Sequence, residues 1–304
     1  MDLVIVVVAP GQGSQTPGFL TPWLELDGVR ERLEALGDAA ELDLVSLGTT
    51  ADADTIRRTE IAQPLIVAAG IVTAAALERT PSAVAGHSVG EVTASVVSGV
   101  LSDVDGMRLV AVRGRAMAEA AAAVLTGMSA VVGGDETAVV ERLTELGLIP
   151  ANRNGGGQIV AAGELAALDT LRAEPPAGTR VIPLQVAGAF HTAFMAPAVD
   201  ALRGFAAGLA PADPSARLWT NKDGSEVGSG SAYLDLLVGQ VASPVRWDRC
   251  MESFAAAGIT GLVELAPAGT LTGLAKRGLK GVPTVAVKTP ADLAAAQDLL
   301  DRTA

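Results

Sequence analysis

The segment Gly86-His87-Ser88-Val89-Gly90 constrains the fold of this chain more than any other, because of what flanks it. A short apolar run, residues 82–85, precedes it, and a helix-forming stretch of small and apolar residues, 91–97, follows it. Glycines on both sides of a central serine allow a sharp strand-to-helix turn that holds the serine in strained backbone. We therefore predict a nucleophile elbow with Ser88 as the nucleophile. The alternative is an ordinary glycine-rich turn with a solvated serine.

The chain as a whole has the pattern of an α/β protein. Apolar runs typical of buried strands alternate with helical periodicity, which favours a largely parallel sheet. The expected strands of this sheet are residues 3–8, 82–85, 218–220, 261–265 and 284–287, with long helices at 61–77 and 103–123. The run at 3–8 has no basic segment before it and stops at Pro10, so we interpret it as a buried strand and not as a signal peptide or membrane span.

The pattern changes in the middle of the chain. We expect a β-α-β-α-β succession there, with strands at 128–132, 158–162 and 180–186 and helices at 135–146 and 164–171. We therefore predict an α/β-hydrolase-like catalytic domain with a parallel sheet, made of residues 1–125 and 189–304. A small ferredoxin-like domain, residues 126–188, is inserted into it.

Composition narrows the classes of function. The 304 residues carry a formal net charge of −12, whereas nucleic-acid binding requires clustered lysine and arginine. One cysteine, Cys250, and two histidines offer neither a disulfide framework nor a pattern of metal ligands. We expect a soluble cytoplasmic protein that uses no metal or other cofactor and binds neither nucleic acid nor a membrane.

A serine nucleophile needs a base, and histidine has the ordinary pKa that suits this role near neutral pH. The two histidines of the chain are His87 and His191. His87 is adjacent to Ser88, so its side chain should point away from the serine. His191 follows the end of an expected strand, where catalytic groups on α/β sheets usually project. We predict that His191 is the base; the alternative is a structural histidine.

The first expected strand runs into a glycine-rich loop, Pro10-Gly11-Gln12-Gly13-Ser14-Gln15. The loop lacks the lysine of a P-loop and the third glycine of a dinucleotide fingerprint, so we reject a nucleotide role. Such a loop can instead present backbone N–H groups to a developing oxyanion, together with the N–H that follows the nucleophile. The two donors would be the amides of Gln12 and Val89. The alternative is a plain tight turn.

Arg113 lies on the largely apolar helix expected at 103–123 and precedes Gly114, which permits close approach of another segment. A guanidinium in such a place can hold a carboxylate with two parallel hydrogen bonds. The alternative is a solvated arginine on the helix surface, which is how we interpret the neighbouring Arg115.

These motifs together resemble those of the malonyl-CoA:acyl carrier protein transacylases and the related acyltransferase domains of polyketide synthases, enzymes of fatty acid and polyketide biosynthesis. The resemblance covers nearly the whole chain. It rests on these blocks, in order: Gly11-Gln12-Gly13-Ser14-Gln15, Gln63-Pro64, Gly86-His87-Ser88-Val89-Gly90-Glu91, Arg113-Gly114, residues 152–163, Phe190-His191, Gln240 with Pro244-Val245-Arg246-Trp247, and Leu271-Thr272-Gly273-Leu274.

The resemblance implies a ping-pong transfer. Malonyl-CoA acylates Ser88, CoA leaves, and the phosphopantetheine thiol of acyl carrier protein collects the malonyl group. The resemblance also implies that His191 acts as base and then as acid. No aspartate orients the histidine in this family, and the main-chain carbonyl of Gln240 occupies the matching position.

Further roles are implied by the same resemblance. The amides of Gln12 and Val89 would form the oxyanion hole, Arg113 would bind the malonyl carboxylate, and Gln63 would line the pocket. Phe190, directly before the base, is similar to the bulky residue of the malonyl-selective members. A ring there would disfavour an α-methyl group by about 1–3 kcal/mol.

The implied partners are malonyl-CoA and acyl carrier protein, and we expect the chain to act as a monomer. Acyl carrier protein is acidic, so its docking surface on this acidic chain must be locally positive. Lys276, Arg277 and Lys280 form the densest basic cluster in the sequence. We predict that they form the docking surface; the alternative is a solvated helix face.

Two other functions remain open. A serine esterase or thioesterase would use the same elbow, but it would need a carboxylate to orient its histidine and no arginine in the acyl pocket. A degenerate acyltransferase fold retained as a docking module is disfavoured, because Ser88, His191, Arg113 and Gln240 are all present.

Overall fold

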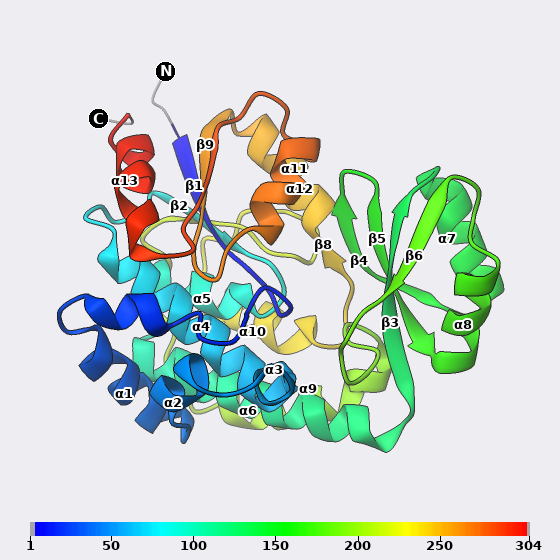
Figure 1. Ribbon diagram of the computed structural model, residues 1–304, viewed down its shortest axis with the longest axis horizontal. Coiled ribbons are helices and arrows are strands. Elements are labelled where there is room, and N and C mark those ends of the chain that lie inside the picture. Colours follow the sequence, from blue (N-terminus) through cyan, green and yellow to red (C-terminus); the bar gives the residue numbers. More distant parts are fainter. Residues whose placement is uncertain (1–3, 303–304) are drawn as a thin grey trace.

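The computed structural model describes residues 4–302, and Figure 1 shows its two β-sheets. In the first sheet the strand order is β10-β9-β1-β2-β7, and every neighbouring pair is parallel. Its strands are β1 (Val4–Ala9), β2 (Ala83–Gly86), β7 (Arg217–Leu218), β9 (Ile259–Glu264) and β10 (Thr284–Ala286). The predicted parallel sheet is confirmed; Leu3, which we assigned to the first strand, lies outside the described residues.

Helices surround this sheet. They are α1 (Val29–Ala40), α2 (Leu44–Thr49), α3 (Ala53–Arg57), α4 (Thr59–Ala76), α5 (Gly90–Val97), α6 (Asp103–Ala123), α9 (Ala196–Ala206), α10 (Gly230–Gln240), α11 (Trp247–Ala256), α12 (Thr270–Gly278) and α13 (Leu293–Asp301), with 3-10 turns η1 (Thr21–Glu25), η2 (Ala193–Met195) and η3 (Pro290–Asp292). Helix α6 has the predicted bounds because Ser102 caps it: the Ser102 hydroxyl accepts a hydrogen bond from the Asp105 N–H at 3.1 Å.

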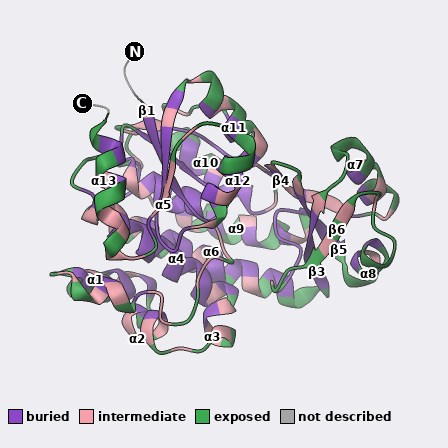
Figure 2. Cartoon of the chain, turned by 45° about the horizontal axis from the view of Figure 1, so that its top comes forward, coloured by how far each residue is buried: buried purple, intermediate pink, exposed green. Residues whose placement is uncertain are grey.

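Both faces of the first sheet are covered, which explains the unbroken apolar sequence of β1. Ile5 and Val7 belong to a core cluster with residues of α4 and α6. Val6 and Val8 point the other way and pack with residues of α11 and α12. Figure 2 shows the resulting distribution, with a buried centre and exposed outer helices.

Helix α4 is the only helix in the described part of the chain that is long and apolar enough to cross a membrane. Its most apolar window is 72% buried inside the protein, and its residues make up much of the main core cluster. Its hydrophobicity is therefore accounted for by packing against the sheet and α6.

The second sheet has the strand order β6-β3-β5-β4-β8. Its elements are β3 (Thr126–Gly133), α7 (Glu136–Glu145), β4 (Ile149–Gly155), β5 (Gln158–Glu164), α8 (Leu165–Ala173), β6 (Thr179–Pro183) and β8 (Val245–Arg246). The pairs β3–β5, β3–β6 and β4–β5 are antiparallel, and β4–β8 is parallel. Figure 1 shows α7 and α8 on the outer side of this sheet.

The predicted β-α-β-α-β succession is wrong in one respect, because a strand, β4, lies between α7 and β5. The run Asn152-Arg153-Asn154-Gly155 has low strand propensity and hid this strand from the sequence pattern. Cross-strand pairing with β5 outweighs that local preference. A fifth strand, β8, also joins the sheet from the returning chain, well outside the predicted range 126–188.

The second sheet faces the carboxyl edge of the first. Its inner residues Val160 and Ala162 belong to the same core cluster as α4 and α6. Close to the end of β2, the His87 ring hydrogen-bonds across to Asn154 of β4, Nε2 to Oδ1, at 2.8 Å. The carboxyl ends of β1, β2 and β7 therefore open toward this junction, which is where parallel α/β sheets place their reactive groups.

Candidate active site

The turn after β2 is a strained elbow. Ser88 has φ of 53°, a left-handed conformation that is costly for a residue with a side chain. A Cβ on Gly86 would lie 2.0 Å from the carbonyl carbon of Gly90, and one on Gly90 would lie 2.2 Å from the oxygen of Ala9. Both glycines are therefore required for the chain to turn within this space.

His191 meets Ser88 across the site. Its Nε2 lies 2.7 Å from Ser88 Oγ, and its Nδ1 lies 2.9 Å from the carbonyl oxygen of Gln240. A carbonyl can only accept, so Nδ1 carries the proton and Nε2 is left to accept from the serine hydroxyl. Its backbone is fixed as well, because the His191 N–H donates to the Val241 carbonyl at 2.9 Å.

Burial favours the neutral form of both histidines. It lowers the pKa of His191 to about 3, and the positive charge of Arg113 contributes further. Burial also lowers the pKa of His87, which points away from Ser88 and bonds Asn154. A neutral His191 at physiological pH is the form that can accept the serine proton.

These shifts predict an acid-labile fold. Below about pH 6.5 the unfolded chain protonates His191 while the native state, in which its pKa is lowered to about 3, does not. The free energy of unfolding therefore falls by up to about 1.4 kcal/mol per pH unit on account of this histidine, and the lowered pKa of His87 acts in the same direction. Glu91 acts in the opposite direction, because burial raises its pKa to about 7 and its native form binds a proton that the unfolded chain has released. The effects of His191 and Glu91 oppose each other between pH 6.5 and 4.5, so the lowered pKa of His87 gives the net loss of stability its sign.

Urea unfolding at pH 5, 5.5 and 6 checks this prediction. The glutamine of His191→Gln cannot bind a proton. In this variant the slope of the free energy of unfolding against pH should be smaller than in the unmodified protein by the equivalent of about one proton. Parallel curves for the two proteins would show that His191 is not held neutral in the native state.

Arg113 is buried, with 2% of its surface exposed. Its guanidinium donates to Gln63 Oε1 at 2.5 Å and to Gln240 Oε1 at 2.7 Å, and it lies 3.5 Å from Ser88 Oγ. All of its hydrogen-bond partners among residues 4–302 are neutral side chains. Burial lowers the pKa of Arg113 to about 10, with Glu91 acting in the opposite direction, so the group remains cationic at neutral pH.

The neighbouring glycine and arginine behave as the sequence suggests. A Cβ on Gly114 would lie 3.1 Å from Glu60 Cα, so this glycine lets α6 approach the first turn of α4. Arg115 is half exposed and forms an ion pair with Glu41 at 3.5 Å. The helix thus presents one arginine to the site and one to solvent.

The predicted oxyanion donors flank the elbow. Gly11 lies against His87, since a Cβ there would be 3.0 Å from the His87 carbonyl oxygen. Within residues 4–302, the amides of Gln12 and Val89 donate no hydrogen bond to the protein. Unpaired N–H groups beside a strained serine can donate hydrogen bonds to an anionic oxygen.

The remaining predicted residues lie in two places. Gln63 and Phe190 are buried, with 1% and 6% of their surfaces exposed, and Gln63 contacts Arg113 directly. Lys276, Arg277 and Lys280 are exposed on and just after α12. Arg277 Nε donates to the Gly156 carbonyl at 3.2 Å, so this basic cluster reaches the hairpin of the second sheet.

Sequence reasoning missed two residues of the site, Glu91 and Asn221. Both are buried and both bond the elbow or its supports. Asn221 follows the carboxyl end of β7, so the same strand-end rule that favoured His191 points to it. Glu91 carries no such signal, because an acid in the first turn of a helix is ordinarily explained by the helix dipole.

A strained serine bonded to a neutral histidine at the edge of a parallel sheet defines an acyl-transfer or hydrolytic site. The family described as the acyl transferase domain matches residues 6–296. The chain belongs to this family and is an acyltransferase, which confirms the resemblance inferred from its motifs.

Curated relatives specify the family further. The malonyl CoA-acyl carrier protein transacylase of Mycobacterium tuberculosis is 53% identical over 296 residues, covering 95% of this chain and 98% of that protein. The Escherichia coli K12 protein of the same name is 33% identical over 303 residues, covering 96% and 98%.

Solved structures agree with these relatives. The crystal structure of MCAT from M. tuberculosis matches with a TM-score of 0.94 and 52% identity, covering 97% of this chain and 99% of that one. A second structure is that of PlMCAT:AntF, a type II PKS acyl-carrier protein in complex with its malonyl-transacylase. A chain of this complex matches with a TM-score of 0.89 and 31% identity, covering 97% of this chain and 99% of that one.

Proposed function

We propose that this chain transfers the malonyl group of malonyl-CoA to the phosphopantetheine thiol of acyl carrier protein by way of a malonyl-Ser88 intermediate. The observation that carries the proposal is Arg113: a buried cation, hydrogen-bonded to neutral groups only, 3.5 Å from the nucleophile. A buried charge requires compensation, and a substrate carboxylate supplies it. The names of the relatives at 53% and 33% identity support the same substrate.

In the first half-reaction His191 Nε2 takes the proton of Ser88 Oγ as that oxygen attacks the thioester carbonyl. The carbonyl oxygen becomes an oxyanion and is stabilised by the amides of Gln12 and Val89. The intermediate collapses with cleavage of the C–S bond. The leaving sulfur of CoA receives the proton from His191, and malonyl-Ser88 remains.

The second half-reaction runs the same steps with the thiol of acyl carrier protein. His191 takes the thiol proton, the sulfur attacks the Ser88 ester, and the oxyanion forms in the same place. Collapse breaks the C–O bond, and His191 returns the proton to Ser88 Oγ. No net proton or electron is gained over the cycle. The backbone carbonyl of Gln240, 2.9 Å from His191 Nδ1, orients the histidine in both half-reactions.

Selectivity in this proposal depends on two contacts. The Arg113 guanidinium binds the malonyl carboxylate through two parallel hydrogen bonds. Gln63 Oε1 accepts a hydrogen bond from this guanidinium at 2.5 Å and so fixes its orientation. The buried ring of Phe190, next to the base, leaves little room for an α-methyl group, a preference worth about 1–3 kcal/mol.

A transfer assay tests the proposal against the hydrolase alternative. The protein is incubated with malonyl-CoA, labelled in the malonyl group, with and without phosphopantetheinylated acyl carrier protein. The expected result is rapid appearance of label on the carrier protein and little free malonate. Free malonate as the main product in both tubes would establish a thioesterase instead.

We also propose that Lys276, Arg277 and Lys280 bind the acidic carrier protein. Their exposure on and just after α12 supports this. The carrier protein complex of a relative at 31% identity supports acyl carrier protein as the partner. Arg277→Glu should raise the KM for acyl carrier protein about tenfold at low salt and leave the KM for malonyl-CoA unchanged. The matched control is Arg203→Glu on α9, and an equal effect of both changes would remove this assignment.

The finer description of the fold is likewise a proposal. The order β-α-β-β-α-β and the strand order β6-β3-β5-β4 support a ferredoxin-like small domain at 126–188. The elbow after β2 supports an α/β-hydrolase-like domain of residues 1–125 and 189–304.

We propose that the protein is a cytoplasmic monomer that uses no cofactor. Its net charge of −12 favours a protein that binds neither nucleic acid nor a membrane.

A further inference from the structure

The side chain of Asn221 supports the elbow through two hydrogen bonds to its backbone. Its side-chain Oδ1 accepts a hydrogen bond from the Ser88 N–H at 2.7 Å, and its Nδ2 donates to the Gly86 carbonyl at 2.7 Å. The side chain is fully buried. One carboxamide thus bridges the residues on either side of His87 and supports the left-handed conformation of Ser88.

Glu91 connects this support to Gln240. Its Oε1 accepts from the Asn221 N–H at 2.6 Å, and its Oε2 accepts from Gln240 Nε2. Gln240 Nε2 also donates to the Ser88 carbonyl at 2.9 Å, and Gln240 Oε1 accepts from Arg113 at 2.7 Å. The Glu91 carboxylate is therefore linked to the Arg113 guanidinium through a single carboxamide.

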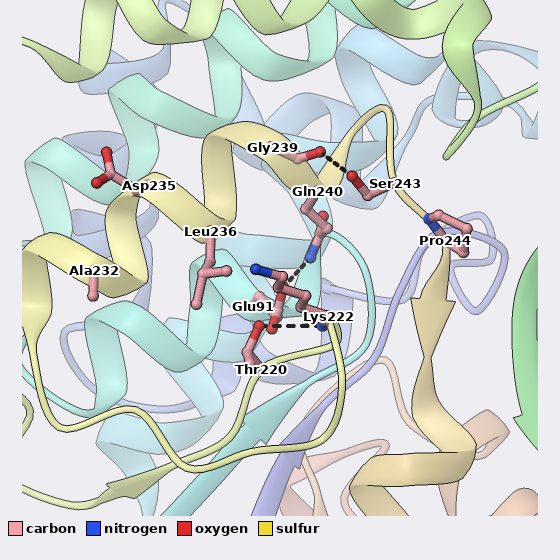
Figure 3. Close-up of a pocket in the computed structure, with 10 residues that line it drawn as sticks. All are labelled: Glu91, Thr220, Lys222, Ala232, Asp235, Leu236, Gly239, Gln240, Ser243 and Pro244. Carbon is pink, nitrogen blue, oxygen red and sulfur yellow. Dashed lines mark hydrogen bonds between the residues drawn. The ribbon is translucent and has the colours of Figure 1, made fainter.

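The far side of this network borders a cavity. A volume of about 480 Å³ lies between α10 and the loop after β7, and Figure 3 shows the residues that line it: Glu91, Thr220, Lys222, Ala232, Asp235, Leu236, Gly239, Gln240, Ser243 and Pro244. In this view the Gln240 amide points at the Glu91 carboxyl group. Among the described residues, Ser88, Arg113 and His191 do not line the cavity, so Glu91 and Gln240 separate it from the reacting atoms.

We propose that Glu91 is a positioning residue for substrate selection: by accepting from Gln240 Nε2 it fixes the carboxamide orientation that holds the Arg113 guanidinium beside Ser88. The inference deepens the proposed function and rests on it, since it takes Arg113 to bind the substrate carboxylate.

The orientation of the Gln240 carboxamide depends on which neighbouring groups donate and which accept hydrogen bonds. A carboxylate can only accept, so Glu91 directs the NH₂ end of the Gln240 side chain toward itself and the oxygen toward Arg113. With glutamine at position 91, an amide NH₂ competes for that place. Rotation of the Gln240 carboxamide would then set its NH₂ against the guanidinium N–H groups, and Arg113 would lose an anchor.

The first test is Glu91→Gln, assayed at pH 8, above the pKa of about 7 to which burial raises the Glu91 carboxyl. We expect the KM for malonyl-CoA to rise about tenfold and the preference for malonyl-CoA over acetyl-CoA to fall about tenfold, the loss expected for one charge-assisted hydrogen bond. Inactivation of Ser88 by an uncharged sulfonyl fluoride should change less than about threefold, because this reaction does not use Arg113.

Two further variants guard against a merely structural effect. Glu91→Asp keeps an acceptor-only carboxylate and should retain more of the malonyl preference than Glu91→Gln. Glu264→Gln is the matched control: Glu264 is also fully buried and accepts from the N–H groups of Leu271 and Thr272 at 2.9 and 2.8 Å. Its loss should lower thermal stability without changing the malonyl preference.

A double-mutant cycle tests whether Glu91 acts through Arg113. In an Arg113→Ala background, Glu91→Gln should change malonylation less than about twofold, whereas independent effects would multiply. A full tenfold effect in that background, or an unchanged KM and preference in Glu91→Gln alone, would overturn the inference. Failure of the unmodified protein to form any malonyl adduct would instead overturn the proposed function.

Discussion

Replacing His191 with alanine is expected to lower kcat/KM for malonyl transfer by about 10³-fold, and by no less than about 10²-fold, the range of general acid–base catalysis. In the proposed mechanism both half-reactions need its Nε2, which lies 2.7 Å from Ser88 Oγ, as proton acceptor and then as donor. Steady-state kinetics with malonyl-CoA and acyl carrier protein measure the loss.

The control for this variant is His87→Asn. His87 is just as buried but bonds Asn154, so its loss should affect stability more than the chemical step. If the two variants lost activity equally, with equal unfolding midpoints, His191 would not be the base.

Arg113→Ala should change what the protein accepts. Removing the guanidinium would remove the two hydrogen bonds that we propose it makes to the malonyl carboxylate. We therefore expect kcat/KM for malonyl-CoA to fall about 10²- to 10³-fold, equivalent to about 3–4 kcal/mol. Acetyl-CoA, whose acyl group has no carboxylate, should become as good a substrate as malonyl-CoA or better. The ratio of the two rates is the quantity to measure.

Arg115→Ala is the matched control, two residues along the same helix. Arg115 is half exposed and pairs with Glu41, an arrangement worth little to stability. Its loss should leave both rates within about twofold. Unchanged malonyl kinetics in Arg113→Ala would show that this arginine does not bind the substrate.

The sequence predicted the parts of the fold in which local pattern and tertiary structure agree. The strand before Ser88 and the helix at 103–123 were found from their apolar patterns, and in the structure the Ser102 cap supports the same helix start. Strand β4 was missed because most of its residues are polar or glycine. Its place is set by pairing with β5 and β8, and no local signal carries that information.

The same distinction between local and long-range information applies to the residues of the site. Ser88 and His191 were predicted because the elbow has its own spacing and the chain has few histidines. The roles of Arg113 and Gln240 required the family resemblance, since burial of an arginine on a helix cannot be read from its neighbours. Asn221 hydrogen-bonds to Ser88, from which it is 133 residues distant in the sequence. Its place in the site results from contacts between distant segments, which the local sequence does not reveal.

Trapping the intermediate tests the central claim most directly. The protein is mixed with malonyl-CoA in the absence of acyl carrier protein, and its intact mass and peptide masses are measured together with the CoA released. We predict a mass increase of one malonyl group on the peptide containing Ser88, one CoA released per chain, and removal of the adduct when acyl carrier protein is added. An unmodified Ser88 after CoA release, or the same adduct in Ser88→Ala, would contradict the account.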